Sequence, residues 1–197
     1  MDAMDAMDAV DASAARVVEL VGQVRPEQWS EPTPCTEWDV RTLVGHLIAT
    51  RQGYCALLAG GSAADLLSFI TRQREAAGTD PVATLISAVR SVRAAFAEPG
   101  ALGRTVSHPV GDIAGSQLLG MLVMDSVIHA WDLATAIGVD AGLDEQLVDQ
   151  AYGFLAPRAE GGRLYARGSF APPARPLPEG ATPLERLMHI AGRSAQW

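Results

Sequence analysis

The sequence is poor in several residue types, and each shortage excludes a class of protein. Its 197 residues include only two cysteines, Cys35 and Cys55, which are too few for the disulfide framework of a small secreted fold. Aromatic residues make up 6% of the chain, and 15 Lys and Arg residues face 23 Asp and Glu residues. The net charge of -8 leaves no basic stripe that could follow phosphates, so we expect no nucleic-acid partner.

Uninterrupted apolar runs and a targeting pattern are also lacking. No such run reaches the roughly 18 residues that span a bilayer, and no basic region precedes an apolar segment with a cleavage site. We therefore expect a soluble, cytoplasmic protein with no membrane partner, present as a monomer or homodimer. A chain of 197 residues fits one domain with a sizeable core.

The apolar residues of the sequence follow a helical pattern, because they recur at spacings of three and four. Asp80-Pro81 and Thr182-Pro183 are typical of helix starts, Thr36 with Asp39 resembles a capping box, and Gly138 follows the richest apolar stretch. The helices predicted in this way cover about residues 9–24, 37–58, 63–73, 81–96, 117–137 and 143–156, with a last short helix after residue 182.

The segments between these helices have no regular pattern. Residues 1–8 are a triplet repeat that we expect to be frayed. Residues 103–115 are predicted to form a loop. Residues 157–180 are rich in Gly and Pro and are predicted to be irregular. No strand is predicted. We therefore expect a single domain, residues 9–197, with an all-α, up-and-down four-helix bundle, additional short helices and an irregular C-terminal segment.

The predicted helix 117–138 carries an unusual polar stripe. Asp125 and His129 are separated by about 40° around the helix axis, and Asp132 lies within about 20° of Asp125. Apolar residues share that face, and a carboxylate removed from water costs several kcal/mol unless it is paired or bound to a cation. A metal ion, a buried pair of protonated His and carboxylate, or a water-filled cleft would each compensate it.

A histidine on another predicted helix favours the metal. His46 lies on an inward-facing part of residues 37–58, and two imidazoles with one carboxylate from facing helices are typical of a metal site with open positions. The spacing of four residues between Asp125 and His129 sets two ligands within reach of one ion. Spacing alone is a weak signal, since a His on an apolar face is more often a satisfied core residue.

Three blocks strengthen this interpretation. PTPCTEWDVRTLVGHLI, VGDIAGSQLLGMLVMDSVIHAWDLATAIG and TPLERLMHIAGRSAQW together resemble an actinobacterial DinB-like family related to mycothiol-dependent maleylpyruvate isomerase. The resemblance spans nearly the whole chain from about residue 10. It implies a DinB-type four-helix bundle in which one His of the second helix and an acidic-x-x-x-His pair of a later helix hold a divalent metal.

The resemblance assigns the metal ligands to His46, Asp125 and His129. Asp125 stands where the family usually has Glu, and one methylene fewer shortens its reach by about 1.3 to 1.5 Å. Zinc is favoured because imidazole and carboxylate ligands with an open position are its usual catalytic set, while nickel and iron(II) also suit these ligands.

The implied function is a metal-dependent isomerase or transferase that uses mycothiol as a cosubstrate. The metal would activate a thiol or a water molecule for attack on a small electrophilic substrate. Two alternatives remain open from the sequence. One is a metal-dependent hydrolase or Lewis-acid enzyme of specialised metabolism, and the other is a non-catalytic DinB-like protein that binds a ligand.

Other candidate residues have simpler interpretations. Asp132 is interpreted as orienting an imidazole, or as a cap for the Trp-bearing loop, rather than as a ligand. Cys35, near a predicted helix start where a thiol pKa falls, is interpreted as part of a structural loop, and Cys55 as packing. His108 is interpreted as a solvated loop residue, although it could reach a substrate from its loop. His189 is interpreted as a surface residue, with a local specialisation as the alternative.

Overall fold

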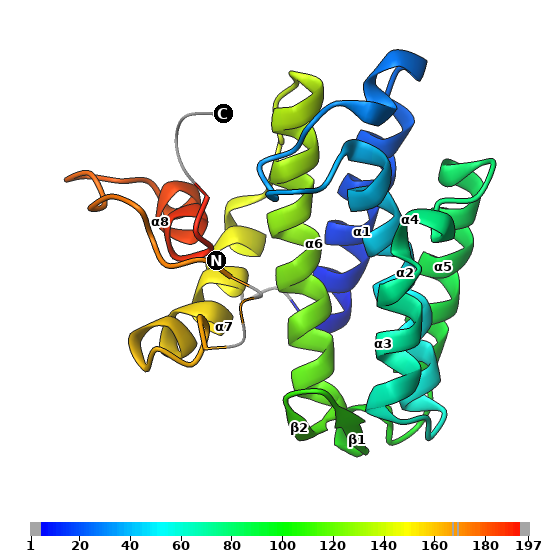
Figure 1. Cartoon of the computed structure of the whole chain (residues 1–197). Coiled ribbons are helices and arrows are strands. Elements are labelled where there is room, and N and C mark those ends of the chain that lie inside the picture. The colour runs from blue at the N-terminus through cyan, green and yellow to red at the C-terminus, as the bar shows by residue number, and fades with distance from the viewer. Residues whose placement is uncertain (1–4, 167, 169, 194–197) are drawn as a thin grey trace.

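Four long helices form a bundle in the computed structural model, which describes residues 5–166, 168 and 170–193. They are α1 (Ala6–Gly22), α2 (Val40–Leu58), α5 (Pro81–Ala97) and α6 (Gly115–Ile137). Helix α2 packs against α5 and α6, and α1 packs against the same two helices, so the four close a ring (Figure 1). The predicted all-α bundle is confirmed.

Shorter elements decorate this bundle. Between α2 and α5 lie α3 (Ala63–Thr71) and α4 (Gln73–Ala76), and after α6 come α7 (Glu145–Glu160) and α8 (Pro183–Ile190). Helices α7 and α8 pack on each other beside α6, on the side away from α2 (Figure 1). Two 3-10 helices, η1 (Pro26–Ser30) and η2 (Ala101–Gly103), complete the helical elements of the described residues.

Several helix ends follow the capping residues of the sequence. The carboxylate of Asp80 accepts from the backbone N–H of Ala83 at the start of α5, and Thr182 and Glu185 form a capping box at the start of α8. Gly138 ends α6 in a left-handed conformation, with φ 75°, which a glycine adopts without the steric cost that a Cβ imposes. These predicted ends are confirmed.

The predicted start of α2 is wrong. Glu37 has φ 72° and so cannot belong to a right-handed helix. Thr36 is not the cap; the helix begins at Val40, where the carboxylate of Asp39 accepts from the backbone N–H of Thr42 at 2.8 Å. The left-handed turn at Glu37 keeps the preceding residues as a loop that folds back over the bundle.

The expectation of no strand is also wrong. Residues expected to be a loop form a two-stranded antiparallel hairpin, β1 (Thr105–His108) and β2 (Gly111–Ala114), in which Val106 pairs with Ile113. Four-residue strands offer too few positions for an alternating pattern to be recognised. The hairpin lies at the end of the bundle where α6 begins (Figure 1).

Two other boundaries differ from expectation. Helix α1 begins at Ala6, capped by Asp5, so part of the segment expected to be frayed, residues 1–8, is helical; residues 1–4 lie outside the described part. Helix α7 continues to Glu160 and includes Pro157. Because Pro157 is exposed in the last turn, its missing N–H is tolerated there, and the irregular segment begins only after it.

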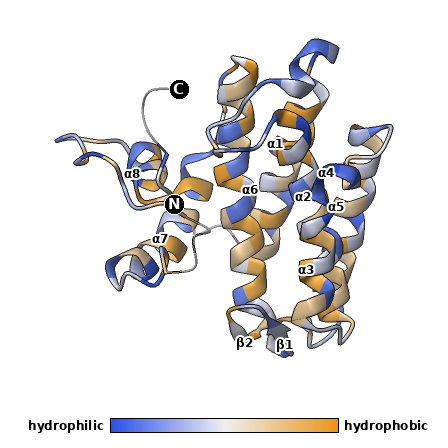
Figure 2. Ribbon diagram, viewed as in Figure 1, coloured by the Kyte–Doolittle hydropathy of each residue, from blue (hydrophilic) through white to orange (hydrophobic). Residues whose placement is uncertain are grey.

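Helix α6 is the central element of the fold. Its buried residues contribute to both apolar clusters of the core, and Figure 2 shows apolar positions along much of its length. Among the described residues, α6 is the one helix that is long and apolar enough to cross a membrane, although no such helix was expected from the sequence. However, 72% of its apolar 18-residue stretch is buried inside the fold. A core helix is expected to meet the same criteria.

Candidate metal centre

Helices α2 and α6 place three potential metal ligands next to one another. His46 lies on α2, and Asp125 and His129 lie one turn apart on α6. The Oδ1 atom of Asp125 is 3.2 Å from Nε2 of His46 and 3.4 Å from Nε2 of His129. One ligand atom from each residue lies within 4.8 Å of the other two. The three residues selected from the sequence are thus brought together.

The two carboxylate oxygens of Asp125 differ in their contacts. Although aspartate is shorter than glutamate, its Oδ1 reaches both imidazoles, so the shorter side chain does not prevent contact. Its Oδ2 is buried and has no hydrogen-bond partner among the described residues. Such an atom is costly unless a donor or cation satisfies it. Two imidazoles and this carboxylate suit a divalent ion, and the residues therefore fit the expected metal.

A buried guanidinium supplies positive charge beside this carboxylate. Arg51 of α2 is 1% exposed, and its Nη2 donates to the hydroxyl of Ser126 on α6 at 2.9 Å. Burial lowers the pKa of Arg51 to about 10, against the opposing effect of Asp125. Burial would raise the pKa of Asp125, but the neighbouring His46 and His129 hold it well below its usual range. Asp125 is therefore ionised at neutral pH.

The outer nitrogen of His46 contacts an amide. Its Nδ1 lies 3.2 Å from Oε1 of Gln73, the first residue of α4. Helix α4 can approach α2 this closely because position 45 is glycine: a Cβ on Gly45 would meet the carbonyl oxygen of Gln73 at 1.9 Å. If Nδ1 carries the proton and donates to Gln73, Nε2 has its lone pair available to a metal.

The outer nitrogen of His129 contacts a carboxylate instead. Nδ1 lies 2.9 Å from Oδ2 of Asp132, which is fully buried. Arg193, beyond the end of α8, pairs with the same carboxylate through both oxygens, at 3.1 Å from Nε and 2.7 Å from Nη2. Asp132 therefore contacts the imidazole and is itself paired with a cation, an arrangement consistent with an orienting residue.

The loop before α2 covers the two imidazoles. The ring of Trp38 lies 4.7 Å from that of His46 and 5.7 Å from that of His129, between centroids. The loop is fixed by the backbone of Thr33, which donates to the carbonyl of Trp38 at 3.0 Å. The side chains of His46, Asp125 and His129 retain 14%, 18% and 9% exposure, so the site is enclosed but not sealed.

The charges around His129 favour its protonated form when no cation competes. Burial by itself would lower its pKa, but the carboxylates of Asp125 and Asp132 raise the pKa of His129 to about 9. A divalent ion at the same locus would replace that proton, since only neutral imidazole coordinates a metal.

Comparison with known proteins identifies the family. The model of the mycothiol maleylpyruvate isomerase N-terminal domain family matches residues 10–134. The chain belongs to this family. The match includes His46, Asp125, His129 and Asp132, together with Gln73, and it ends before α7, α8 and Arg193.

Relatives and solved structures agree with the family assignment. An uncharacterized protein of Mycobacterium tuberculosis strain H37Rv, Rv0738, is 30% identical over 179 residues, which cover 90% of this chain and 91% of the relative. The crystal structure of the mycothiol-dependent maleylpyruvate isomerase superposes with a TM-score of 0.62 at 15% identity, covering 76% of this chain and 68% of that chain. A histidine-to-alanine mutant of that isomerase gives a TM-score of 0.60, with the same identity and coverage. The solved structures show that the fold is shared.

Cys35 lies close to His129 and Asp132. Its thiol, a nitrogen of His129 and an oxygen of Asp132 lie within 4.8 Å of one another. Burial raises the pKa of Cys35 to about 11, although Arg193 opposes the shift. A thiol that stays protonated at neutral pH, beside a carboxylate already paired with Arg193, fits the structural role that the sequence analysis gave it.

The remaining candidates lie outside the cluster. His108 ends β1 and its ring lies 6.2 Å from that of Tyr54. Cys55 packs against the apolar core. His189 of α8 lines a cavity on the other side of α6. None of the three belongs to the His46, Asp125 and His129 group.

Three residues that support the site were missed from the sequence. Gln73 begins the four-residue helix α4 and Arg193 lies beyond the end of α8, and nothing in their neighbourhood links them to a particular histidine. Arg51 did carry a signal, since a charged residue in the apolar helix of residues 37–58 requires a partner.

Proposed function

We propose that this protein is a divalent-metal-dependent isomerase or transferase that uses a low-molecular-weight thiol, with the metal held by His46, Asp125 and His129. The observation that carries the proposal is the arrangement at Asp125, where one oxygen lies within 3.4 Å of both imidazoles and the other is buried without a partner. Family membership supports the mycothiol-linked class of reaction. We favour zinc as the ion.

The protein's own residues would hold this centre in a defined state. A divalent ion held there lowers the pKa of a bound thiol or water molecule and so supplies a nucleophile near neutral pH. Gln73 and Asp132 fix the rings of His46 and His129 from outside. Arg193 neutralises Asp132, so that carboxylate orients its histidine without adding a net negative charge.

The ring of Trp38 would limit access to the centre. It lies against both imidazoles, and an apolar ring at this place excludes water from one side of the histidines, which strengthens the electrostatic interactions within. Substrate and thiol would therefore approach from the side where His46 and Asp125 retain their exposure.

Metal binding is tested by titration of the metal-stripped protein with zinc, nickel and iron(II). We expect one ion per chain, and at least a 100-fold loss of affinity in each of His46→Ala, His129→Ala and Asp125→Asn, since each removes one of three ligands. His108→Ala, which changes a histidine outside the cluster, is the matched control. Equal binding by His46→Ala and the wild type would overturn the metal site.

The reaction class is tested separately with the zinc-loaded protein. The solved structural relative is a mycothiol-dependent maleylpyruvate isomerase, so isomerisation of maleylpyruvate with and without mycothiol is the first assay. Activity that requires the thiol supports the proposal. Turnover of a substrate without any thiol would favour the hydrolase alternative, and a protein that neither binds metal nor turns over substrate would be a ligand-binding member of the family.

A further inference from the structure

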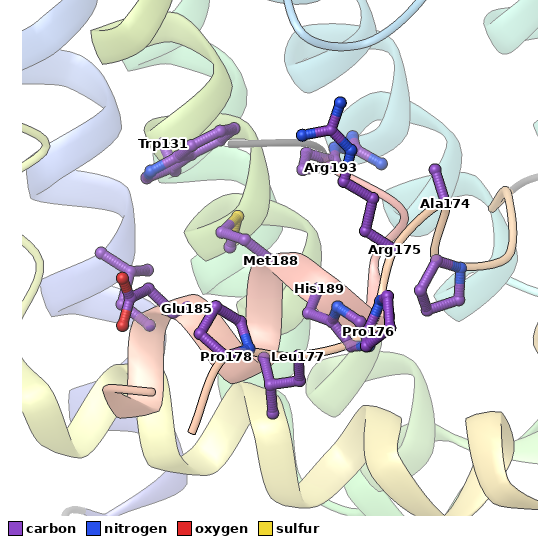
Figure 3. A pocket seen from close by; sticks show the side chains of 12 residues that line it. Trp131, Ala174, Arg175, Pro176, Leu177, Pro178, Glu185, Met188, His189 and Arg193 are labelled. Atoms are coloured by element: carbon purple, nitrogen blue, oxygen red, sulfur yellow. The ribbon is translucent and has the colours of Figure 1, made fainter. Parts of the chain in front are cut away.

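A cavity of about 300 Å³ lies beside α6, bounded by α8 and a proline-rich segment (Figure 3). Trp131 contributes from α6, and the remaining lining residues come from the C-terminal part of the chain: Pro173, Ala174, Arg175, Pro176, Leu177, Pro178, Leu184, Glu185, Met188, His189 and Arg193. Of these, only Trp131 lies within the segment that the family model matches. The cavity is thus built by the part of the chain that follows the family's matched domain.

The segment that covers the cavity is fixed in place. Gly192, with φ 73°, packs so closely on Ala171 that a Cβ would meet its carbonyl oxygen at 2.3 Å. Tyr165 donates its hydroxyl to the carbonyl of Ile190 at the end of α8 at 3.2 Å. Four prolines, at positions 172, 173, 176 and 178, further restrict the backbone of the covering segment. The cavity therefore has a defined wall.

Two guanidinium groups face this cavity, and they differ in their partners. Arg175 has no ion pair or hydrogen bond among the described residues, and it is exposed. Arg193 uses two N–H groups for Asp132 and one for the carbonyl of Ala191, and it also hydrogen-bonds the thiol of Cys35. At most one of its five N–H groups remains. Figure 3 shows both arginines toward one end of the cavity and Glu185 toward the other.

The acidic residue of the cavity is already engaged. Oε2 of Glu185 accepts from the backbone N–H of Thr182 at 2.7 Å and from its hydroxyl at 2.9 Å, in the capping box of α8. The positive end of the cavity is therefore available to an external anion. The rest of the wall is apolar, with the ring of Trp131 and the side chains of Leu177, Leu184 and Met188.

We propose that this cavity binds a small organic carboxylate with an apolar or aromatic body. The carboxylate pairs with the unpaired guanidinium of Arg175 and is attracted by the positive charge of Arg193, and the body packs on Trp131 and Met188. A volume of about 300 Å³ lies at the lower end of the range for small-molecule sites, which suits a ligand the size of a substituted aromatic acid. The site is distinct from the proposed metal centre, because none of His46, Asp125 and His129 lines it.

The test uses calorimetric titration of the full chain with 3-phenylpropionate and with its uncharged amide, 3-phenylpropionamide. We expect the carboxylate to bind at least tenfold more tightly than the amide, because a charge-assisted hydrogen bond contributes about 1.5–3 kcal/mol, which is about 10- to 100-fold in affinity. No detectable binding of 3-phenylpropionate, or equal affinity for acid and amide, would overturn the proposal.

Variants locate the binding and separate it from the metal. Arg175→Gln removes the unpaired cation and Leu177→Asp adds a negative charge at an exposed position of the wall, so each is expected to weaken 3-phenylpropionate binding about 10-fold or more. Arg90→Gln, an exposed arginine of α5, is the matched control. His46→Ala should bind 3-phenylpropionate as the wild type does, whether or not the metal centre exists. Unchanged affinity in both Arg175→Gln and Leu177→Asp would place the binding elsewhere and refute the assignment.

Discussion

The side-chain oxygen of Gln73 lies 3.2 Å from Nδ1 of His46, on the side of the imidazole that faces away from Asp125. The equivalent contact of His129 is made by a carboxylate, Asp132. The two histidines are therefore held by partners of different charge. A neutral amide fixes the orientation of His46 without placing a further negative charge beside it.

This contact predicts the effect of a substitution at Gln73. Gln73→Leu should weaken zinc affinity about 10- to 100-fold, the usual consequence of losing a residue that orients a ligand, whereas Gln73→Glu should retain binding because it can still accept from Nδ1. Titration with zinc measures both. Gln23→Leu, at an exposed position after α1, should bind as the wild type, and a Gln73→Leu variant that does the same would show that the amide is not needed.

The close approach of α4 to α2 predicts a cost at Gly45. In Gly45→Ala the new Cβ would meet the backbone of Gln73, so α4 must move, and we expect about 1–3 kcal/mol of destabilisation together with weaker zinc binding. Gly22→Ala, also in a helix but with open space at its Cβ, should be neutral or slightly stabilising. Urea denaturation of both variants checks this. Equal stability of the two would mean that α4 is not held against α2.

The protonation of His129 predicts how zinc affinity depends on pH. The pKa of His129 is raised to about 9 by Asp125 and Asp132 despite burial, so a proton competes with the metal at any pH below about 9. Apparent affinity should fall by up to about tenfold per pH unit from pH 9 downward, and binding at pH 7.5 should release about one proton. For an unperturbed imidazole, the same loss of affinity would begin only below about pH 6.5. Titration in buffers of different ionisation enthalpy measures the released proton, and no release at pH 7.5 would refute the prediction.

The same shift predicts the pH dependence of stability in the metal-free protein. Because the folded-state pKa of His129 lies above its unfolded value, its contribution is fully present below about pH 6.5 and is lost as pH rises toward 9. The free energy of unfolding should therefore decline over this range by at most about 1.4 kcal/mol per pH unit. His129→Gln should flatten that part of the profile. If the free energy of unfolding of His129→Gln declines as steeply with pH, another titrating group causes the decline.

Cys35 provides a prediction about the loop beside the metal. Its raised pKa, about 11, leaves about one thiolate in a thousand at pH 8, so Cys35 should react slowly with a thiol reagent. Cys35→Ser should lower stability modestly and leave the zinc stoichiometry at one. Elemental analysis of the purified variant checks the metal, and loss of zinc from Cys35→Ser would show that the thiol is a ligand.

The sequence contained enough to predict the helices and the central group of the site. Asp80 and Thr182 mark helix starts by local hydrogen bonds, and Asp125 and His129 share a helix face through their spacing, so both inferences depend on residues close together in the chain. His46 was found because its helix is strongly apolar and because of the family resemblance.

Other features depend on contacts that no local pattern encodes. Glu37 adopts a left-handed conformation that glycine or asparagine would have signalled, and the four-residue strands of the hairpin are too short to show alternation. Gln73 reaches His46 across 27 positions and Arg193 reaches Asp132 across 61. Residues so far apart in the sequence are brought together only by tertiary packing, such as the close approach of α4 to α2 at Gly45.

The pairing of Arg193 with Asp132 joins the chain beyond α8 to the C-terminal part of α6, the helix that carries two of the three proposed metal ligands. The segment matched by the family model therefore contains a buried negative charge whose partner comes from outside that segment. A shortened chain ending near residue 134 would leave Asp132 uncompensated beside His129. The C-terminal part of this protein thus supports the proposed metal centre and also forms the wall of a separate cavity, and the two parts of the chain are expected to have changed together in evolution.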